Sequence, residues 1–145
     1  MEAPPIESAP LLAGAPLLAA ISTNIVAILR DRYGRGPMTA KTYAVDDLVV
    51  VVTRDRGFTA LEQTMMDHDE PSLVVTMRRD FEHDMTQLYT ETIERLTGRT
   101  VLAFLSQAHV DPGITMETFF LDAPVEGFAA VEIARPRKPR RPPPA

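Results

Sequence analysis

The sequence predicts an α+β fold, a two-layer α/β sandwich in which helices cover one face of a four-stranded sheet. The main observation is an internal repeat, because the order helix, Gly-Arg, strand, turn, strand occurs twice. The helical pattern of the first copy ends at Gly34-Arg35, and that of the second ends at Gly98-Arg99. Neither a helix nor a hairpin buries its apolar face alone, so the two copies should share one core as an (αββ)×2 pseudo-repeat.

The length of the chain is the second observation, since 145 residues suit one domain with a core of its own. We expect this domain to span residues 17–131. Residues 1–16 are rich in proline and alanine and predict a disordered arm. Residues 132–145 are basic and rich in proline and predict an extended, solvated tail.

The first helix is predicted from an apolar stripe at spacings of three and four residues. Its members are Leu17, Ile21, Ile25, Ile28 and Leu29. The uncharged run 9–29 is long enough to span a bilayer, but prolines interrupt it and its flank is acidic, which favours a soluble amphipathic helix. Gly34 supplies the positive φ that ends the helix, and Gly36 belongs to the turned connection to the first strand.

Four strands are expected at residues 42–45, 48–52, 101–105 and 114–121. Asp46-Asp47 forms the turn of the first hairpin, and a polar loop over 106–113 joins the second pair. Residues 48–52 and 101–105 are apolar without alternation, a pattern typical of strands covered on both faces. Helices from one chain cover only one face, so a second copy or a partner subunit is expected on the other.

Two helices are expected between the hairpins. Thr59 and Glu62 form a capping box that starts a short helix ending near residue 66. A long helix is predicted from Pro71 to Thr97, and Gly98 ends it. The charged run 67–70 before it is interpreted as a helix entry.

Charge and composition exclude several classes of function. Five of the fifteen basic residues lie in 135–141, which leaves ten basic against twenty acidic residues and a net charge of −10 in the rest. An acidic body argues against nucleic acid binding by the fold, so any contact with an anionic surface should come from the tail. The chain has no cysteine, which excludes disulfides and favours a reducing, cytoplasmic location.

Candidate binding residues lie in two segments. In the first, residues 34–41, backbone N–H groups with Arg35 and Lys41 suit a small anion. In the second, the predicted loop 106–113, His109 and Asp111 suit a ligand or a partner, while a backbone hydrogen bond of His109 and a turn are the structural alternatives. No catalytic residue, metal site or cofactor is predicted, and the chain is more readily understood as a non-enzyme.

Several segments together resemble the small bacterial MpsC family. They are Tyr33-Gly34-Arg35-Gly36-Pro37, Ala40-Lys41-Thr42-Tyr43, Asp47-Leu48-Val49-Val50-Val51, Thr59-x-x-Glu62, Leu96-Thr97-Gly98-Arg99-Thr100-Val101 and Phe104-x-Ser106-x-x-His109-x-Asp111-Pro112. The resemblance covers about residues 17–122 and transfers no catalytic residue.

The resemblance implies an accessory component of a Na+-translocating, membrane-potential-generating system that is linked to inorganic carbon uptake. We therefore expect a non-enzymatic interaction protein that forms a homo-oligomer, works beside an antiporter-like membrane subunit and lies at the inner face of the membrane. The alternative is a small-anion-binding protein or enzyme that uses the Gly34 to Lys41 loop and His109.

Overall fold

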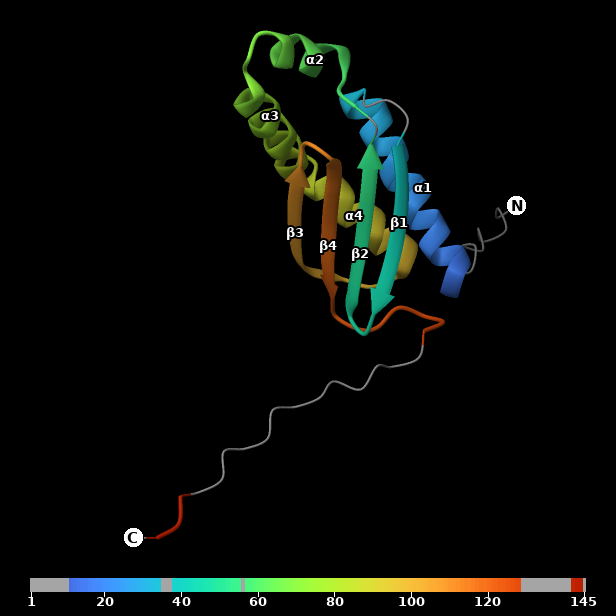
Figure 1. Cartoon of the computed structure of the whole chain (residues 1–145). Helices are drawn as coiled ribbons and strands as arrows, with labels where there is room; N and C mark the ends of the chain where they lie inside the picture. Colours follow the sequence, from blue (N-terminus) through green and yellow to red (C-terminus); the bar gives the residue numbers. More distant parts are fainter. Residues whose placement is uncertain (1–10, 35–37, 56, 129–141, 145) are drawn as a thin grey trace, which may run out of the picture.

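The chain folds into an open antiparallel sheet with a layer of helices on one side (Figure 1). The structure is a computed structural model, and it describes residues 11–34, 38–55, 57–128 and 142–144. The helices are α1 (Gly14–Tyr33), α2 (Ala60–Asp67), α3 (Pro71–Asp84) and α4 (Thr86–Thr97). The strands are β1 (Met38–Val45), β2 (Leu48–Asp55), β3 (Val101–His109) and β4 (Gly113–Leu121). The predicted α+β class is confirmed.

The two copies of the repeat lie side by side in the sheet. The strand order is β1-β2-β4-β3, and every neighbouring pair is antiparallel. Each hairpin comes from one copy, and the copies meet where β2 pairs with β4, with Val49 opposite Phe119. The strands β1 and β3 therefore form opposite edges of the sheet.

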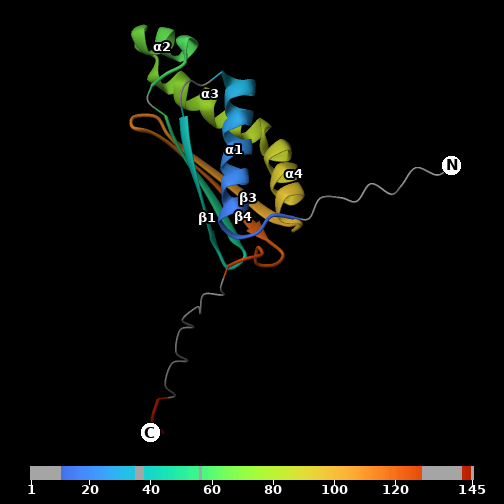
Figure 2. The ribbon, with the colours of Figure 1, turned by 90° about the vertical axis from the view of Figure 1, so that its right-hand side faces the viewer.

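The core lies between the sheet and the helix layer, which occupies one side of the sheet (Figure 2). In α1 the buried side chains recur at every fourth residue, at Leu17, Ile21, Ile25 and Leu29, as the apolar stripe predicts. They pack with side chains from α4 and the central strands, namely Val49, Val51, Tyr89, Ile93, Phe119 and Leu121. The helix-facing side of the sheet is thus covered by the chain itself.

Glycines end the helix of each copy, at Gly34 and Gly98. Their φ values are 72° and 68°, a left-handed conformation that side chains with a Cβ adopt at a cost. The start of α2 carries both hydrogen bonds of a capping box. The Glu62 backbone N–H donates to Thr59 Oγ1, and the Thr59 backbone N–H donates to Glu62 Oε1. Local sequence signals therefore define these helix ends.

The predicted single helix from Pro71 to Thr97 is wrong, because the chain forms α3 and α4 with a break at Met85. Met85 has φ −85° and ψ −1°, and Thr86 Oγ1 donates a hydrogen bond to the His83 carbonyl at 2.7 Å. A threonine hydroxyl that bonds a nearby carbonyl competes with the helical hydrogen-bond pattern. The break lets α3 and α4 follow different directions over the sheet (Figure 1).

Three predicted boundaries also differ from the structure. The expected loop 106–113 is mostly strand, since β3 continues to His109 and pairs with β4, which supplies partners for its backbone. Both strands of the first hairpin are longer than expected. The predicted arm 1–16 overlaps α1, which begins at Gly14 because Pro16 lies in the first turn, where a backbone N–H is not needed. Residues 1–10 and most of the predicted tail lie outside the described residues.

Candidate functional site: the open face of the sheet

The side of the sheet turned away from the helices, here called the open face, consists of alternate residues of the four strands. Burial alternates along β2 and β4, so one set of side chains enters the core and the other points away from it. The open-face residues, taken as cross-strand rows in the order β1, β2, β4, β3, are Thr39, Arg54, Ile114 and His109; Lys41, Val52, Met116 and Gln107; Tyr43, Val50, Thr118 and Leu105; and Val45, Leu48, Phe120 and Ala103.

The open face carries large apolar side chains that no described part of the chain covers. Leu105 is 58% exposed, Tyr43 is 46% exposed and Met116 is 44% exposed. Val45 and Phe120 extend this apolar surface, and Leu102 adds to it at the irregular start of β3. Contiguous apolar surface of this kind marks a contact site in soluble proteins. The runs 48–52 and 101–105 are apolar on both sides because one set of their side chains enters the core and the other set lies on this open face.

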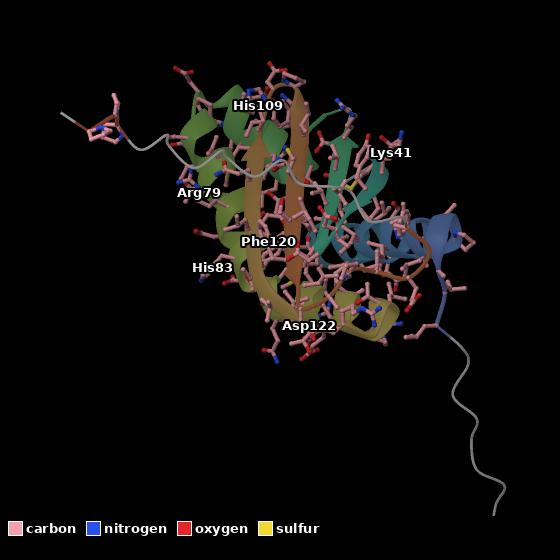
Figure 3. All side chains as sticks on the ribbon, turned by 90° about the horizontal axis from the view of Figure 1, so that it is seen from below. Lys41, Arg79, His83, His109, Phe120 and Asp122 are labelled. Carbon is pink, nitrogen blue, oxygen red and sulfur yellow. The ribbon has the colours of Figure 1, made fainter. Side chains whose placement is uncertain are left out.

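Charge is distributed unevenly along the strands. The exposed side chains of Lys41, Arg54 and His109 lie toward one end of the open face, and none of the open-face residues is Asp or Glu. The opposite end of the sheet is acidic, with Asp46 and Asp47 in the β1–β2 turn and Asp122 after β4. Figure 3 shows this order, with His109, Phe120 and Asp122 following one another along the sheet.

The structure separates the candidate residues of the sequence into different places. Lys41 lies on edge strand β1, with its Nζ 5.2 Å from the centre of the Tyr43 ring. His109 ends β3 at the opposite edge and donates from Nδ1 to the Pro112 carbonyl at 2.7 Å (Figure 3). Asp111 is exposed in the β3–β4 turn beside His109. Arg35 and Gly36 lie outside the described residues.

A buried ion pair joins α2, α3 and the end of α1, and no sequence signal indicated it. Arg78 is 1% exposed, and it donates to both carboxylate oxygens of Glu62, from Nε at 2.6 Å and from Nη2 at 2.9 Å. The Tyr33 hydroxyl donates to the same carboxylate at 2.6 Å, and Arg78 Nη1 lies 3.6 Å from Asp55 Oδ2. The pair anchors the outer helices to the sheet.

The ion pair changes the titration of Glu62. Burial by itself raises the pKa of this carboxyl group, but the hydrogen bonds from Arg78, Tyr33 and the Thr59 backbone outweigh burial and hold its pKa at about 2. Glu62 is therefore ionised at neutral pH. Its two oxygens are occupied by these donors, which makes it a structural group rather than a proton carrier.

Within the described ranges, no group of three or more histidine, aspartate or glutamate side chains is placed to hold a metal ion. In the same ranges no helix is long and apolar enough to cross a membrane.

A family model described as "Na+-translocating membrane potential-generating system (MpsC)" matches residues 15–123. The matched range extends from the first turn of α1 to just beyond β4, so it contains both copies of the repeat and the open face. No curated protein and no solved structure matches the chain.

Proposed function

The chain belongs to the MpsC family, and from this premise we propose that it is a non-enzymatic accessory protein of a Na+-translocating, membrane-potential-generating system, active as a dimer that forms through the open face. The family description supports the system. The uncovered apolar surface of the sheet is the main observation that supports a dimer formed through the open face. The proposal includes the link to inorganic carbon uptake and a place at the inner face of the membrane beside an antiporter-like subunit.

The size of the open face suits a contact between subunits. Four strands of eight or nine residues, at about 3.3 Å per residue and ~4.8 Å between strands, present roughly 500 Å² before side-chain relief is counted. Two such faces would bury about 1,000 Å² in total, which is the lower limit for a specific interface and less than the ~1,600 Å² of a standard one. Sheets also pack face to face in an aligned manner, which lets two open faces form one continuous apolar layer.

The charge pattern supports a second copy as the occupant and favours one direction for its strands. If the twofold axis runs across the strands, β2 of one copy lies antiparallel on β2 of the other. Arg54 of each copy then lies near the start of the other copy's β2, where Asp47 is exposed. An axis along the strands would instead place the basic ends together. Opposite charges at both ends of the contact steer and align the two copies.

The alternative function, a small-anion site or enzyme using the Gly34 to Lys41 loop and His109, has less support. It needs Lys41 and His109 to face one ligand, but they lie on opposite edge strands, and Figure 3 shows them apart. The Nδ1 atom of His109 is also engaged by the Pro112 carbonyl.

We retain from the sequence the proposal that the basic tail contacts an anionic surface, in addition to the dimer contact.

Leu105→Glu tests the function through the open face. A charge at this position would be buried by a second copy, so we expect the mass in solution to fall from twice the 16.0 kDa of one chain to the single value. In cells that lack the gene, wild type should restore a Na+-dependent membrane potential, measured with a potential-sensitive dye, and L105E should not.

Leu61→Glu is the matched control, because Leu61 is 57% exposed on α2, away from the sheet. It should leave both the mass and the membrane potential as in wild type. A wild-type chain that is monomeric at all concentrations would refute the dimer. If deletion of the gene left the Na+-dependent potential unchanged, the accessory role itself would be wrong.

A further inference from the structure

A cavity of about 500 Å³ lies between α3 and edge strand β3, on the helix side of the sheet. From α3 it is lined by Val75, Arg79, Glu82 and His83, and from β3 by Phe104 and Ser106 among others. Volumes of 300–1,000 Å³ are typical of sites for small molecules. Most of its lining lies on the helix side of β3, but Gln107 of the open face also lines it, so the cavity and the open face adjoin at this edge strand.

Glu82 is the unusual residue of the cavity. Its side chain is only 3% exposed, and no group among the described residues donates a hydrogen bond to its buried Oε2. Arg78, one turn earlier in α3, is engaged by Glu62 and Asp55 instead. A buried carboxylate oxygen without a donor is costly. Glu82 also lines the cavity, so a small turn of its side chain would bring the carboxylate to a donor on a bound molecule.

The remaining lining residues indicate what kind of molecule supplies this donor. Arg79 and His83 are exposed and lie one helical turn apart, so they place positive or donor groups at the rim above Glu82. Figure 3 shows both side chains beside β3, at the side of the sheet opposite Lys41. Val75 and Phe104 supply an apolar wall. The cavity thus combines a buried acceptor, a basic rim and an apolar side.

We propose that the α3–β3 cavity binds a small zwitterion, an α-amino acid with an apolar side chain. The ammonium group donates to Glu82, the carboxylate lies at Arg79, and the side chain packs on Val75 and Phe104. Charge-assisted hydrogen bonds of this type are about twice as strong as neutral ones, and the pair of opposite charges gives the site its specificity. Binding here would make the accessory protein responsive to a metabolite.

The experiment uses L-leucine and two analogues that each lack one charge, isoamylamine and 4-methylpentanoate, on the full chain. L-leucine at millimolar concentration should raise the melting temperature and bind in calorimetry, and each analogue should bind ~10-fold more weakly or worse, since it leaves one charged group of the site unpaired. Equal binding of isoamylamine and L-leucine would overturn the zwitterion assignment, and so would the absence of any shift with L-leucine.

Variants locate the binding in the cavity. Glu82→Gln keeps the size of the side chain but removes its charge, so it should abolish the shift caused by L-leucine. Arg79→Ala changes an exposed rim residue and should weaken binding without affecting folding. Asp84→Asn removes a charge from the same helix outside the cavity and should bind as wild type. An unchanged affinity in both E82Q and R79A would refute the site, whatever the outcome of the dimer experiments.

Discussion

At the scale of single residues, Glu62 shows how one side chain serves both local and tertiary structure. Its Oε1 accepts from the Thr59 backbone N–H at the start of α2, a role that the Thr59-x-x-Glu62 spacing predicts. The same carboxylate accepts from Arg78 and Tyr33, which no spacing predicts, because these residues come from α3 and α1. Arg78 and Tyr33 could be recognised only once the helices were placed.

The buried pair predicts a large effect for Arg78→Met. The substitution keeps an apolar stem but leaves the Glu62 charge buried without its guanidinium, so the free energy of unfolding should fall by about 3–5 kcal/mol in urea titrations. Arg79→Met is the control, since Arg79 is exposed next to it, and its effect should stay within ~0.5 kcal/mol. Similar losses in the two variants would contradict a stabilising role of the pair.

Glu62 also predicts a dependence of stability on pH. Its pKa is lowered from 4.5 to about 2 in the folded chain, so the folded state binds the proton less readily than the unfolded state. The stabilisation is therefore complete above pH 4.5 and is lost as the pH falls toward 2. The lowered pKa of Glu62 contributes about 3 kcal/mol to the free energy of unfolding at neutral pH.

Glu62→Gln should flatten the stability curve between these two pH values in urea titrations. Glu91→Gln, an exposed carboxylate on α4, should leave the slope as in wild type. If E62Q kept the wild-type slope, the titration would have to be assigned to other carboxylates.

At the scale of elements, the ends of the helices were easier to predict than their continuity. Gly34 and Gly98 end α1 and α4 because a glycine at positive φ acts within one helical turn. The break at Met85 has no proline or glycine to mark it. The extension of β3 to His109 was missed for a similar reason, since Ser106 and Gln107 favour a loop locally and become strand by pairing with β4.

The two helix-ending glycines predict similar losses on substitution. Gly34→Ala and Gly98→Ala should each lower the free energy of unfolding by about 1 kcal/mol, because alanine at positive φ is strained. Near Gly34 an added Cβ meets no described atom within 4 Å, and near Gly98 it meets the end of the half-exposed Leu11 side chain, which can move. Urea titrations of both variants measure the cost, and unchanged stability would show that the left-handed conformation is not needed.

At the scale of the whole molecule, the two faces of the sheet differ. Helices cover one face, and the open face has a basic end, with an acidic turn at the other end of the sheet. The chain as a whole is acidic, yet the described strands place no acidic side chain on the open face. The proposed dimer uses this segregation, because each basic end meets the acidic turn of the other copy. The cavity between α3 and β3 adjoins this contact at Gln107, while its residues from α3 lie outside it.

A charge exchange tests the proposed direction of the two copies. Arg54→Glu and Asp47→Arg should each weaken the dimer, seen as a higher dissociation constant in analytical ultracentrifugation, because each creates like charges at both ends of the contact. The double variant should regain most of the affinity at low salt, where surface charges are least screened. If the double variant weakens the dimer by the sum of the two single effects, the antiparallel arrangement is wrong. The L105E experiment would still test whether a dimer of another geometry forms through the open face.

The sequence by itself determined the repeat, the α+β class, the glycine ends of α1 and α4 and the capped start of α2, because these depend on periodicity and on residues that act over a few positions. The resemblance of several sequence segments indicated the MpsC family. The sequence also indicated a face that the chain does not cover, through the unalternated run 48–52. The tertiary structure alone decided the strand order, the Arg78–Glu62 pair, the separation of Lys41 from His109 and the cavity above Glu82. Each of these depends on which distant segments pack together, and local preferences carry no information about that choice.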